Sequence, residues 1–229
     1  MRRGYSKFLT VILIIIIVAV IGLLAYLGYD YYSKYRINKD AQDFVDASTE
    51  GITVDTPTNG DNTSNNTIGN INTNTTGNEQ QNTTGNNTNQ AGKKGTYQGF
   101  YTVGSIEIPK TNVKYPIIEK VTKRSLEKAV AVEWPQPDPV LNEVGNVVIA
   151  GHNYRNGVFF SNNKKLSKGD KIYITDLNKN RVAYTIYNIF ETTDTDASFY
   201  NRDTNGKREI TLKTCTDDSQ RRLIIEARE

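Results

Sequence analysis

The stretch that decides the fold of this chain is Glu209-Ile210-Thr211-Leu212-Lys213-Thr214-Cys215-Thr216-Asp217-Asp218-Ser219-Gln220-Arg221-Arg222-Leu223-Ile224-Ile225. Apolar residues alternate with polar ones in its first part, and an apolar run closes it, so we expect two strands joined by a short polar loop. The loop starts after Cys215, the only cysteine in the chain. Reactive side chains are often carried where a rigid element ends. The stretch therefore predicts a sheet with a chemically competent residue at its edge.

The only histidine of the chain lies at a second predicted strand end. The apolar run Val147-Val148-Ile149-Ala150 is followed directly by Gly151 and His152. A free cysteine, with a pKa near ~8.5, is only slightly ionised at neutral pH, and the thiolate is the reactive form. A charged imidazole or arginine nearby favours the thiolate, and can also protonate a leaving amine or stabilise an oxyanion. Cys215, His152 and either Arg221 or Arg222 would thus suffice for acyl transfer through a thioester.

Each of these residues also has an ordinary structural interpretation. A lone cysteine is most often a small buried side chain, a histidine at a strand end is more often structural, and two adjacent arginines usually form a solvated surface. Spacing alone does not bring His152 and Cys215 together, because they lie far apart in the sequence.

Short strand-like segments recur from residue 96 to the end of the chain. Turn-forming residues separate them, which is typical of a closed β-barrel or a β-sandwich. One short helix is predicted over residues 125–132, and residues 134–139 must form a loop because they contain three prolines. The predicted strands are residues 104–108, 113–118, 146–150, 171–175, 182–192, 209–214 and 223–227.

The chain begins with a signal for membrane insertion. Residues 8–27 carry no charge and follow Arg2, Arg3 and Lys7. As a helix this run would be about 30 Å long, which matches a bilayer core. It exceeds the ~7–15 apolar residues of a cleavable signal, so we predict an uncleaved anchor. The positive residues 1–7 should then be cytoplasmic and the rest of the chain extracellular.

Two further segments separate the anchor from the predicted domain. Residues 28–55 form a charged juxtamembrane segment, which we interpret as a helical extension of the anchor. Residues 56–95 are almost entirely Asn, Thr, Gly, Gln and Ser, so they lack the apolar side chains that offset conformational entropy, and we predict a disordered tether. The folded domain is predicted over residues 96–229. The formal charge of +3 is small and no basic stripe is present, which excludes a nucleic-acid-binding class.

The sequence around Cys215 resembles the signature of a known family. Thr211-Leu212-Lys213-Thr214-Cys215, followed by Arg222, is similar to the Thr-Leu-x-Thr-Cys…Arg motif of sortases, the cysteine transpeptidases of Gram-positive cell walls. The similarity extends over about residues 101–229 in the order of the family. Its other motifs are Gly104-Ser105-Ile106-Glu107-Ile108-Pro109-Lys110, Ala150-Gly151-His152-Asn153 and Gly169-Asp170-Lys171-Ile172-Tyr173.

The resemblance implies a mainly β fold, an eight-stranded sortase barrel with short helices behind one N-terminal anchor. It implies Cys215 as nucleophile, His152 as general acid, Arg222 as oxyanion or substrate clamp, and Thr214 as a substrate-binding position. Arg222 is preferred over Arg221 because the arginine of the family directly precedes an apolar strand. The implied reaction cleaves a Leu-Pro-x-Thr-Gly-like (LPxTG-like) sorting signal after the threonine. It then transfers the surface protein to an amine of a cell-wall precursor or of another surface protein.

The subclass is predicted less sharply than the family. Asn153 and residues 157–160 are similar to class B, but the interval to Cys215 leaves little room for the extra helix of that class. No second hydrophobic span follows Leu223, so we expect a single-anchor enzyme similar to class D or to an atypical class. The chemistry requires no metal and we predict no cofactor. Some sortases are stimulated by calcium, and Asp194 and Asp196 flank a predicted loop, but two loop acids are usually just solvated.

Two alternatives stay open on the sequence alone. An anchored cysteine peptidase or hydrolase would use the same three residues with water as the acceptor. A non-catalytic β-domain, tethered to the membrane and binding the cell wall or a partner, would keep Cys215 buried.

Overall fold

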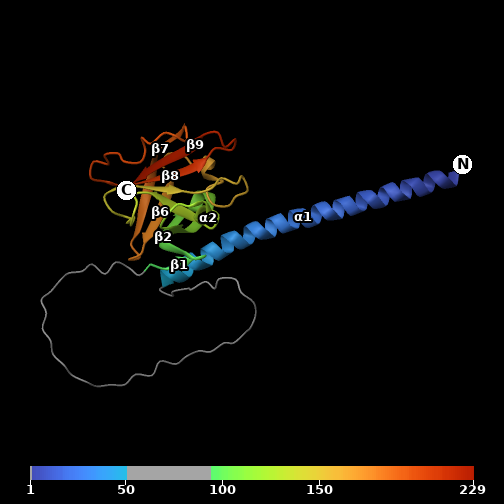
Figure 1. The fold of residues 1–229 in the computed structure, drawn as a ribbon, viewed down its shortest axis with the longest axis horizontal. Helices are drawn as coiled ribbons and strands as arrows, with labels where there is room; N and C mark the ends of the chain where they lie inside the picture. Colours follow the sequence, from blue (N-terminus) through green and yellow to red (C-terminus); the bar gives the residue numbers. More distant parts are fainter. Residues whose placement is uncertain (1, 51–93) are drawn as a thin grey trace, which may run out of the picture.

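The computed structural model describes residues 2–50 and 94–229, which form one long helix and one β-barrel (Figure 1). Most of the predicted linker, residues 56–93, lies outside the described residues. The elements in chain order are α1 (Arg2–Glu50), β1 (Thr96–Tyr97), β2 (Phe100–Ile108), η1 (Pro109–Thr111), β3 (Val113–Ile118), α2 (Lys123–Leu126), β4 (Val130–Trp134), β5 (Gly145–Ala150), η2 (Asn163–Lys165), β6 (Lys171–Asp176), β7 (Arg181–Thr192), β8 (Arg208–Cys215) and β9 (Arg222–Arg228).

Strands β2 to β9 close into an eight-stranded barrel, which confirms the predicted fold class. Their spatial order is β2-β3-β4-β5-β8-β9-β7-β6, and β6 pairs back with β2. The β3–β4 and β5–β8 pairs are parallel, and the other pairs are antiparallel. Closure leaves no unpaired edge within the barrel, and the two-residue strand β1 adds a short pairing with β2.

The alternation in β8 separates the barrel core from an outer face. Ile210 and Leu212 are buried in the main core cluster, as the period of two predicts. The opposite face of the same sheet is also covered, because Phe199 packs on Val148 and Ile224 in a second, smaller cluster. The strands that carry the predicted nucleophile are therefore supported from both sides.

The predicted helix is wrong in its extent, and β2 begins at Phe100, ahead of the strand predicted over residues 104–108. The helix expected over residues 125–132 ends at Leu126, and Val130–Trp134 is instead strand β4. A capping box between Thr122 and Ser125 starts the helix. The residues that follow are rich in β-branched and aromatic side chains, and Val130 and Val132 are completely buried between neighbouring strands. Strand pairing therefore overrides the weak helical spacing. The predicted loop over residues 134–139 is confirmed beyond Trp134, the last residue of β4.

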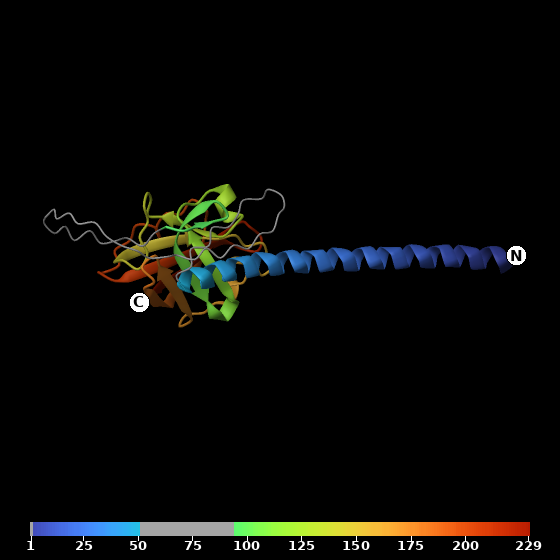
Figure 2. The ribbon, with the colours of Figure 1, turned by 90° about the horizontal axis from the view of Figure 1, so that it is seen from below.

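The long helix α1 leaves the barrel as a straight rod (Figures 1 and 2). It contains a segment, Thr10–Thr49, that is long and apolar enough to cross a membrane. The most apolar part of this segment is not buried against the barrel. The C-terminal turns are different, because Ala41, Phe44 and Val45 are buried against the barrel. The helix thus joins an exposed apolar rod to a docked end without a break.

Candidate active site

Cys215 and Arg222 lie directly opposite each other across the β8–β9 pair. Residues directly opposite in an antiparallel pair project from the same face of the sheet. The Cys215 thiol and the Arg222 guanidinium therefore share one face, at the point where both strands meet the polar loop. Both side chains are half-buried, so they are accessible from solvent while their strands are fixed.

The two adjacent arginines have different surroundings. Arg221 lies in the loop, is exposed, and donates from Nη2 to the carbonyl of Glu191 at 2.8 Å. The side chain of Arg222 is 22% exposed, and its nearest acidic group is the carboxylate of Asp194, at 3.9 Å from Nη2. Within the described part of the chain, its guanidinium donates one hydrogen bond, to the carbonyl of Arg221. Most donors of Arg222 are thus available to a ligand over Cys215.

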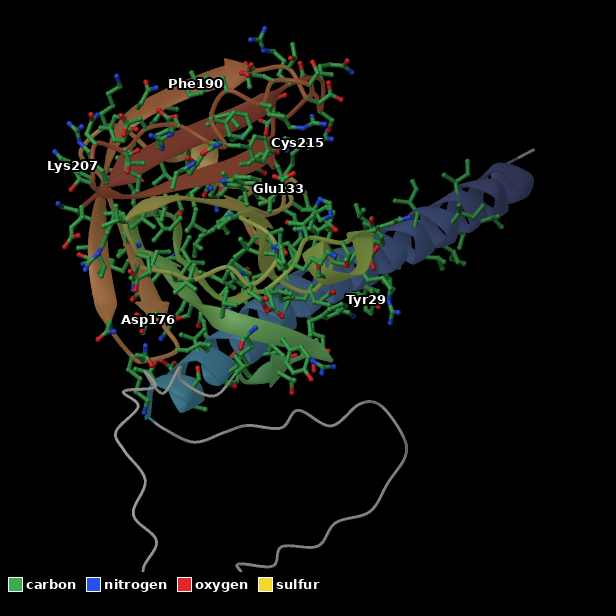
Figure 3. The ribbon with its side chains drawn as sticks, turned by 60° about the vertical axis from the view of Figure 1, so that its left-hand side comes forward. Tyr29, Glu133, Asp176, Phe190, Lys207 and Cys215 are labelled. Carbon is green, nitrogen blue, oxygen red and sulfur yellow. The ribbon has the colours of Figure 1, made fainter. Side chains whose placement is uncertain are left out.

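His152 is brought to Cys215 by the parallel pairing of β5 and β8. Ala150 is the register partner of Lys213, and the amide of Gly151 donates to the carbonyl of Lys213 at 3.1 Å. His152 follows Ala150 by two residues, as Cys215 follows Lys213. The same register therefore brings the backbone at His152 alongside the end of β8 that carries Cys215. Figure 3 shows Cys215 at the end of the barrel that lies away from Lys207.

Contacts of Thr214 and Gly151 hold the end of β8 and the segment that carries His152 in place. The buried hydroxyl of Thr214 donates to the carbonyl of Gly151 at 2.7 Å. Gly151 has no room for a side chain, because a Cβ atom there would lie 2.7 Å from the ring of Phe160. The resemblance implied a substrate-binding position for Thr214, and the structure places its side chain beneath the site, where it joins β8 to the histidine segment.

Asn153 is a site residue for which no role was predicted from the sequence. Its side-chain amide donates to the carbonyl of Cys215 at 2.9 Å and to Asp217 at 3.0 Å. Its side-chain oxygen accepts from the amide of Arg155. Asn153 therefore clamps the histidine segment to the end of β8. Its position directly after the histidine was the available signal, because a short amide side chain at a strand end commonly bonds to nearby backbone groups.

The environment of His152 favours its neutral form. Burial lowers the pKa of this imidazole below its ordinary value, and the carboxylate of Glu127 partly opposes the shift. The ring of Tyr154 lies 4.7 Å from the imidazole, centroid to centroid, and supplies part of the apolar surroundings. A neutral imidazole can accept a proton from a thiol, and the resulting imidazolium can return it to a leaving amine.

The site thus holds a thiol, an imidazole and a guanidinium on adjoining strand ends of a closed barrel. The sequence model of the sortase domain matches residues 106–229, which is more than half of the chain and includes all three residues. This chain belongs to the sortase family.

Similar proteins cover the same part of the sortase chain. Sortase A of Bacillus anthracis is 33% identical over 126 residues, which are 54% of this chain and 57% of that protein. Sortase A of Streptococcus agalactiae is 28% identical over 131 residues, 55% of this chain and 51% of that protein. This chain therefore spans about half the length of the curated relatives it matches.

Solved sortase structures superpose on the barrel. A Clostridium perfringens Sortase D5, described as a transpeptidase, aligns with a TM-score of 0.50 and 33% identity, over 56% of this chain and 78% of that one. Sortase A of Corynebacterium diphtheriae aligns with a TM-score of 0.51 and 28% identity, over 57% of this chain and 61% of that one. The likeness lies in the barrel and its motifs.

The side chains beside Cys215 on the same face of β8 include a charged group. Lys213 lies two residues before Cys215 in β8 and therefore on the same face. Its ammonium donates to Glu133 and to the hydroxyl of Tyr200, at 2.8 and 2.7 Å. Burial lowers the pKa of Lys213, but the bonds to Glu133 and Tyr200 raise it and prevail. Lys213 therefore stays charged, and Glu133 keeps one buried oxygen with no hydrogen-bond partner among the described residues.

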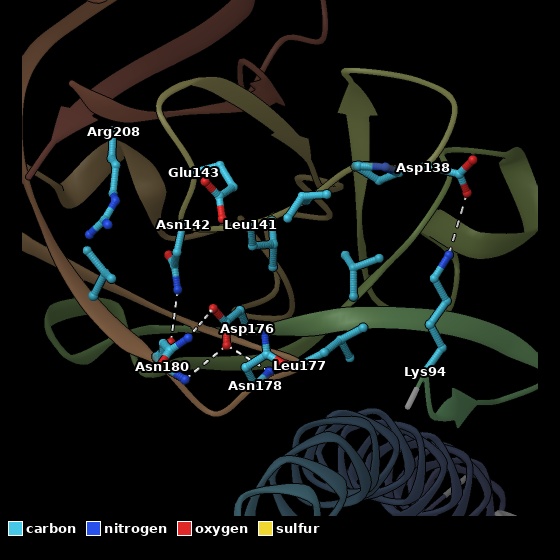
Figure 4. Close-up of a pocket in the computed structure, with 14 residues that line it drawn as sticks. Lys94, Asp138, Leu141, Asn142, Glu143, Asp176, Leu177, Asn178, Asn180 and Arg208 are labelled. Atoms are coloured by element: carbon cyan, nitrogen blue, oxygen red, sulfur yellow. Dashed lines mark hydrogen bonds and ion pairs between the residues drawn. The ribbon is translucent and has the colours of Figure 1, made fainter. Parts of the chain in front are cut away.

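A hollow of about 600 Å³ lies elsewhere in the barrel (Figure 4). Asp138, Asn142, Asp176 and Arg208 are among its lining residues. Arg208 begins β8 whereas Cys215 ends it, so about 23 Å of extended strand separate the two. Chemistry at Cys215 does not take place in this hollow.

The acidic loop residues that bear on calcium have defined positions. Asp196 accepts hydrogen bonds from the Thr192 hydroxyl and the Ser198 amide, and these bonds lower the pKa of its carboxyl group. Asp194 lies near Arg222. Within residues 2–50 and 94–229, no group of three or more His, Cys, Asp or Glu side chains is arranged to hold a metal ion. The absence of a cofactor remains a prediction.

Proposed function

We propose that this sortase is a membrane-anchored cysteine transpeptidase with its barrel on the extracellular side. The observation that carries the proposal is the shared face of Cys215 and Arg222, with His152 on the adjoining strand end. The apolar part of α1 supports the anchor, and the positive residues before it support a cytoplasmic N-terminus.

The first half-reaction forms a thioester. The Cys215 thiolate attacks the carbonyl carbon of the threonine in an LPxTG-like sorting signal, forming a C–S bond. Arg222, which always carries its charge, stabilises the oxyanion that develops. The threonine–glycine C–N bond then breaks, its electron pair leaves with the nitrogen, and the His152 imidazolium supplies the proton.

The second half-reaction releases the product. An amine of a cell-wall precursor or of another surface protein attacks the thioester carbonyl. The C–S bond breaks, sulfur leaves as thiolate, and the proton lost by the amine returns to His152. Thiolate and imidazolium are thereby restored for the next cycle.

The subclass proposal follows the sequence expectation of a class D-like or atypical enzyme with one anchor. The 33% identity to the Clostridium perfringens Sortase D5 supports it. The equal identity to Sortase A of Bacillus anthracis leaves the sorting motif to be determined by peptide specificity.

The test is turnover by the full chain in detergent micelles, with a panel of LPxTG-like peptides and with or without oligoglycine or a side-chain amine. We expect cleavage between threonine and glycine, and a ligated product when amine is present. Cys215→Ala should retain no more than about 1% of turnover, because Cys215 is the only cysteine in the chain. Equal cleavage with no ligated product would favour the hydrolase alternative. A folded chain that neither cleaves any peptide nor reacts with a thiol probe would favour the binding-domain alternative.

A further inference from the structure

The docked end of α1 is part of the barrel core. Ala41 is completely buried, and Phe44 and Val45 are nearly so, although all three lie in the helix that leads from the membrane segment. The ring of Phe44 meets that of Tyr97 edge to face at 5.0 Å between centroids. Ile37 packs on the same core cluster. The spacing of these residues forms one apolar stripe along the helix.

A polar contact joins α1 to the buried residue Tyr115 of β3. The phenol hydroxyl of Tyr115 donates to the side-chain oxygen of Asn38. Tyr115 is only 2% exposed, and burial raises its pKa to about 12, so the hydroxyl keeps its proton. The neighbouring Lys114 also reaches α1 and pairs with Asp46. The interface therefore has an apolar stripe and two polar contacts.

The same hydroxyl also holds the histidine segment. The amide of Phe159 donates to Tyr115 Oη at 3.1 Å, and the two rings lie 5.2 Å apart. Phe159 is buried and has a φ of 53°, a left-handed conformation that is strained for an aromatic residue. A bond to its amide helps to hold it there.

Phe159 is bonded in turn to the segment that carries the imidazole. It forms an isolated β-bridge with Asn153. The amide of the next residue, Phe160, donates to the carbonyl of His152 at 3.1 Å. The ring of Tyr154 lies between the two groups, at 6.0 Å from the Phe159 ring and 4.7 Å from the imidazole. The contacts therefore run without a gap from α1 to His152.

The structure assigns a positioning role to Asn38. We propose that α1, through Asn38 and Tyr115, fixes the segment from His152 to Phe160, so that the anchor helix is a working part of the active site. The inference uses the role of His152 given under the proposed function. It goes beyond that function because a residue on the anchor helix is expected to tune catalysis without touching the substrate.

The test uses the full chain in micelles and two independent readouts. The first is the ring C–H NMR signal of His152, which identifies itself because the chain has one histidine. The second is kcat and KM for a sorting peptide. Asn38→Leu removes the acceptor at similar volume, and we expect a shifted or doubled His152 signal and a fall in kcat of about 10-fold with little change in KM.

Matched variants separate positioning from general damage. Asn38→Asp keeps an accepting oxygen and should restore the NMR signal and most of kcat. Asp46→Asn weakens the same interface at Lys114 without touching Tyr115, and should leave kcat within about twofold. Tyr115→Phe removes the hydroxyl and keeps the ring. It therefore breaks the bonds to both Asn38 and Phe159, and Asn38→Leu should have no further effect in the Tyr115→Phe background, where the bond that it removes is already lost.

Three outcomes would overturn the inference: an unchanged His152 signal in Asn38→Leu, a fall in kcat that Asp46→Asn reproduces, or full additivity with Tyr115→Phe. The NMR readout needs no substrate. A parent chain that turns over no peptide would therefore count against the proposed function, while the shift of the His152 signal would still decide the role of Asn38.

Discussion

At the scale of single residues, strand register places the two arginines in different surroundings. Arg222 is paired with Cys215 across β8 and β9, whereas Arg221 is fixed to the carbonyl of Glu191 in the loop. The preference for Arg222 rested on family resemblance. The register supplies an independent physical reason, because directly opposed residues share a face of the sheet whereas Arg221 lies outside the strand.

We therefore expect the two alanine variants to differ strongly. Removal of a preorganised oxyanion donor costs about 10²–10³ in turnover, so Arg222→Ala should lose at least that much. Arg221→Ala should stay within severalfold of the parent. Arg222→Lys should recover only part of the loss, because an ammonium lacks the planar fork of donors. Steady-state kinetics on one peptide decides the matter, and a crippled Arg221→Ala beside a normal Arg222→Ala would move the role to Arg221.

The imidazole should titrate below the ordinary histidine value of ~6.5, because burial disfavours its charged form. Glu127→Gln removes the charge that opposes this shift and should lower the pKa of His152 further. Glu143→Gln is the control, since Glu143 lines the hollow at the other end of the barrel. An NMR pH titration measures the pKa of His152 in the parent chain, in Glu127→Gln and in Glu143→Gln. A pKa above the ordinary value, or an increase in Glu127→Gln, would contradict the assigned environment.

The same shift has a consequence for stability. The folded pKa of His152 is lowered, so the unfolded chain binds more protons as the pH falls. The contribution of this group to the free energy of unfolding is fully present above pH ~6.5 and is lost as the pH falls towards the folded pKa.

At the scale of elements, the sequence predicted strands better than it predicted contacts between elements. The strand predicted over residues 113–118 has the bounds of β3, because Asn112 precedes this mainly apolar run and the charged Glu119 and Lys120 follow it. Strand β4 was missed because a short buried run has no period of its own once neighbouring strands cover both faces. The bonding partners of Asn153 and of Tyr115 depend on tertiary packing, which no local pattern contains.

The docking of α1 was also missed, although a signal was present. Ile37, Ala41 and Phe44 recur at helical spacing within an otherwise charged segment. This pattern predicts an amphipathic helix but does not identify the surface that covers it. Gly95, which precedes β1, lies near Phe44, so the start of the barrel domain lies beside the docked end of α1. The distance from the membrane segment to the barrel is therefore set by α1.

Phe44→Ala tests the docking of this element. Loss of a buried phenylalanine side chain costs about 3 kcal/mol, so we expect the free energy of unfolding of the barrel to fall by about that amount. Thermal unfolding followed by near-ultraviolet circular dichroism measures the change. Tyr35→Ala is the control, because Tyr35 is an exposed aromatic residue of the same helix. Equal, small effects of the two substitutions would show that α1 does not dock in solution.

At the scale of the whole molecule, α1 also sets the direction in which the site faces. Tyr35 and Asn38, which precede Ala41 on α1, border a hollow of about 750 Å³ with Gly157 and with Asn162, which follows the segment from His152 to Phe160. The later residue Phe44 contacts Tyr97 at the other end. Along α1 from the apolar rod, the catalytic end of the barrel therefore comes first. If the rod crosses the membrane as proposed, the site faces the bilayer.

A change in the length of α1 tests this orientation. Insertion of seven helical residues after residue 28 adds about 10 Å and nearly preserves the docked face. We expect unchanged turnover of a soluble peptide and slower processing of a sorting signal held in the same vesicle membrane. Reconstituted vesicles with both substrates provide the measurement. An equal loss of turnover on both substrates would show that the insertion damages the barrel and does not act only through the distance of the barrel from the membrane.

The central claim is that Cys215 forms a thioester with a sorting signal. Its most direct test is the intact mass of the full chain, quenched in acid during turnover of an LPxTG-like peptide. We predict an added mass equal to the peptide up to its threonine, located on Cys215, removed by hydroxylamine, and absent in Cys215→Ala. Peptide cleavage with no such adduct under any quench, or an adduct that persists in Cys215→Ala, would contradict the account.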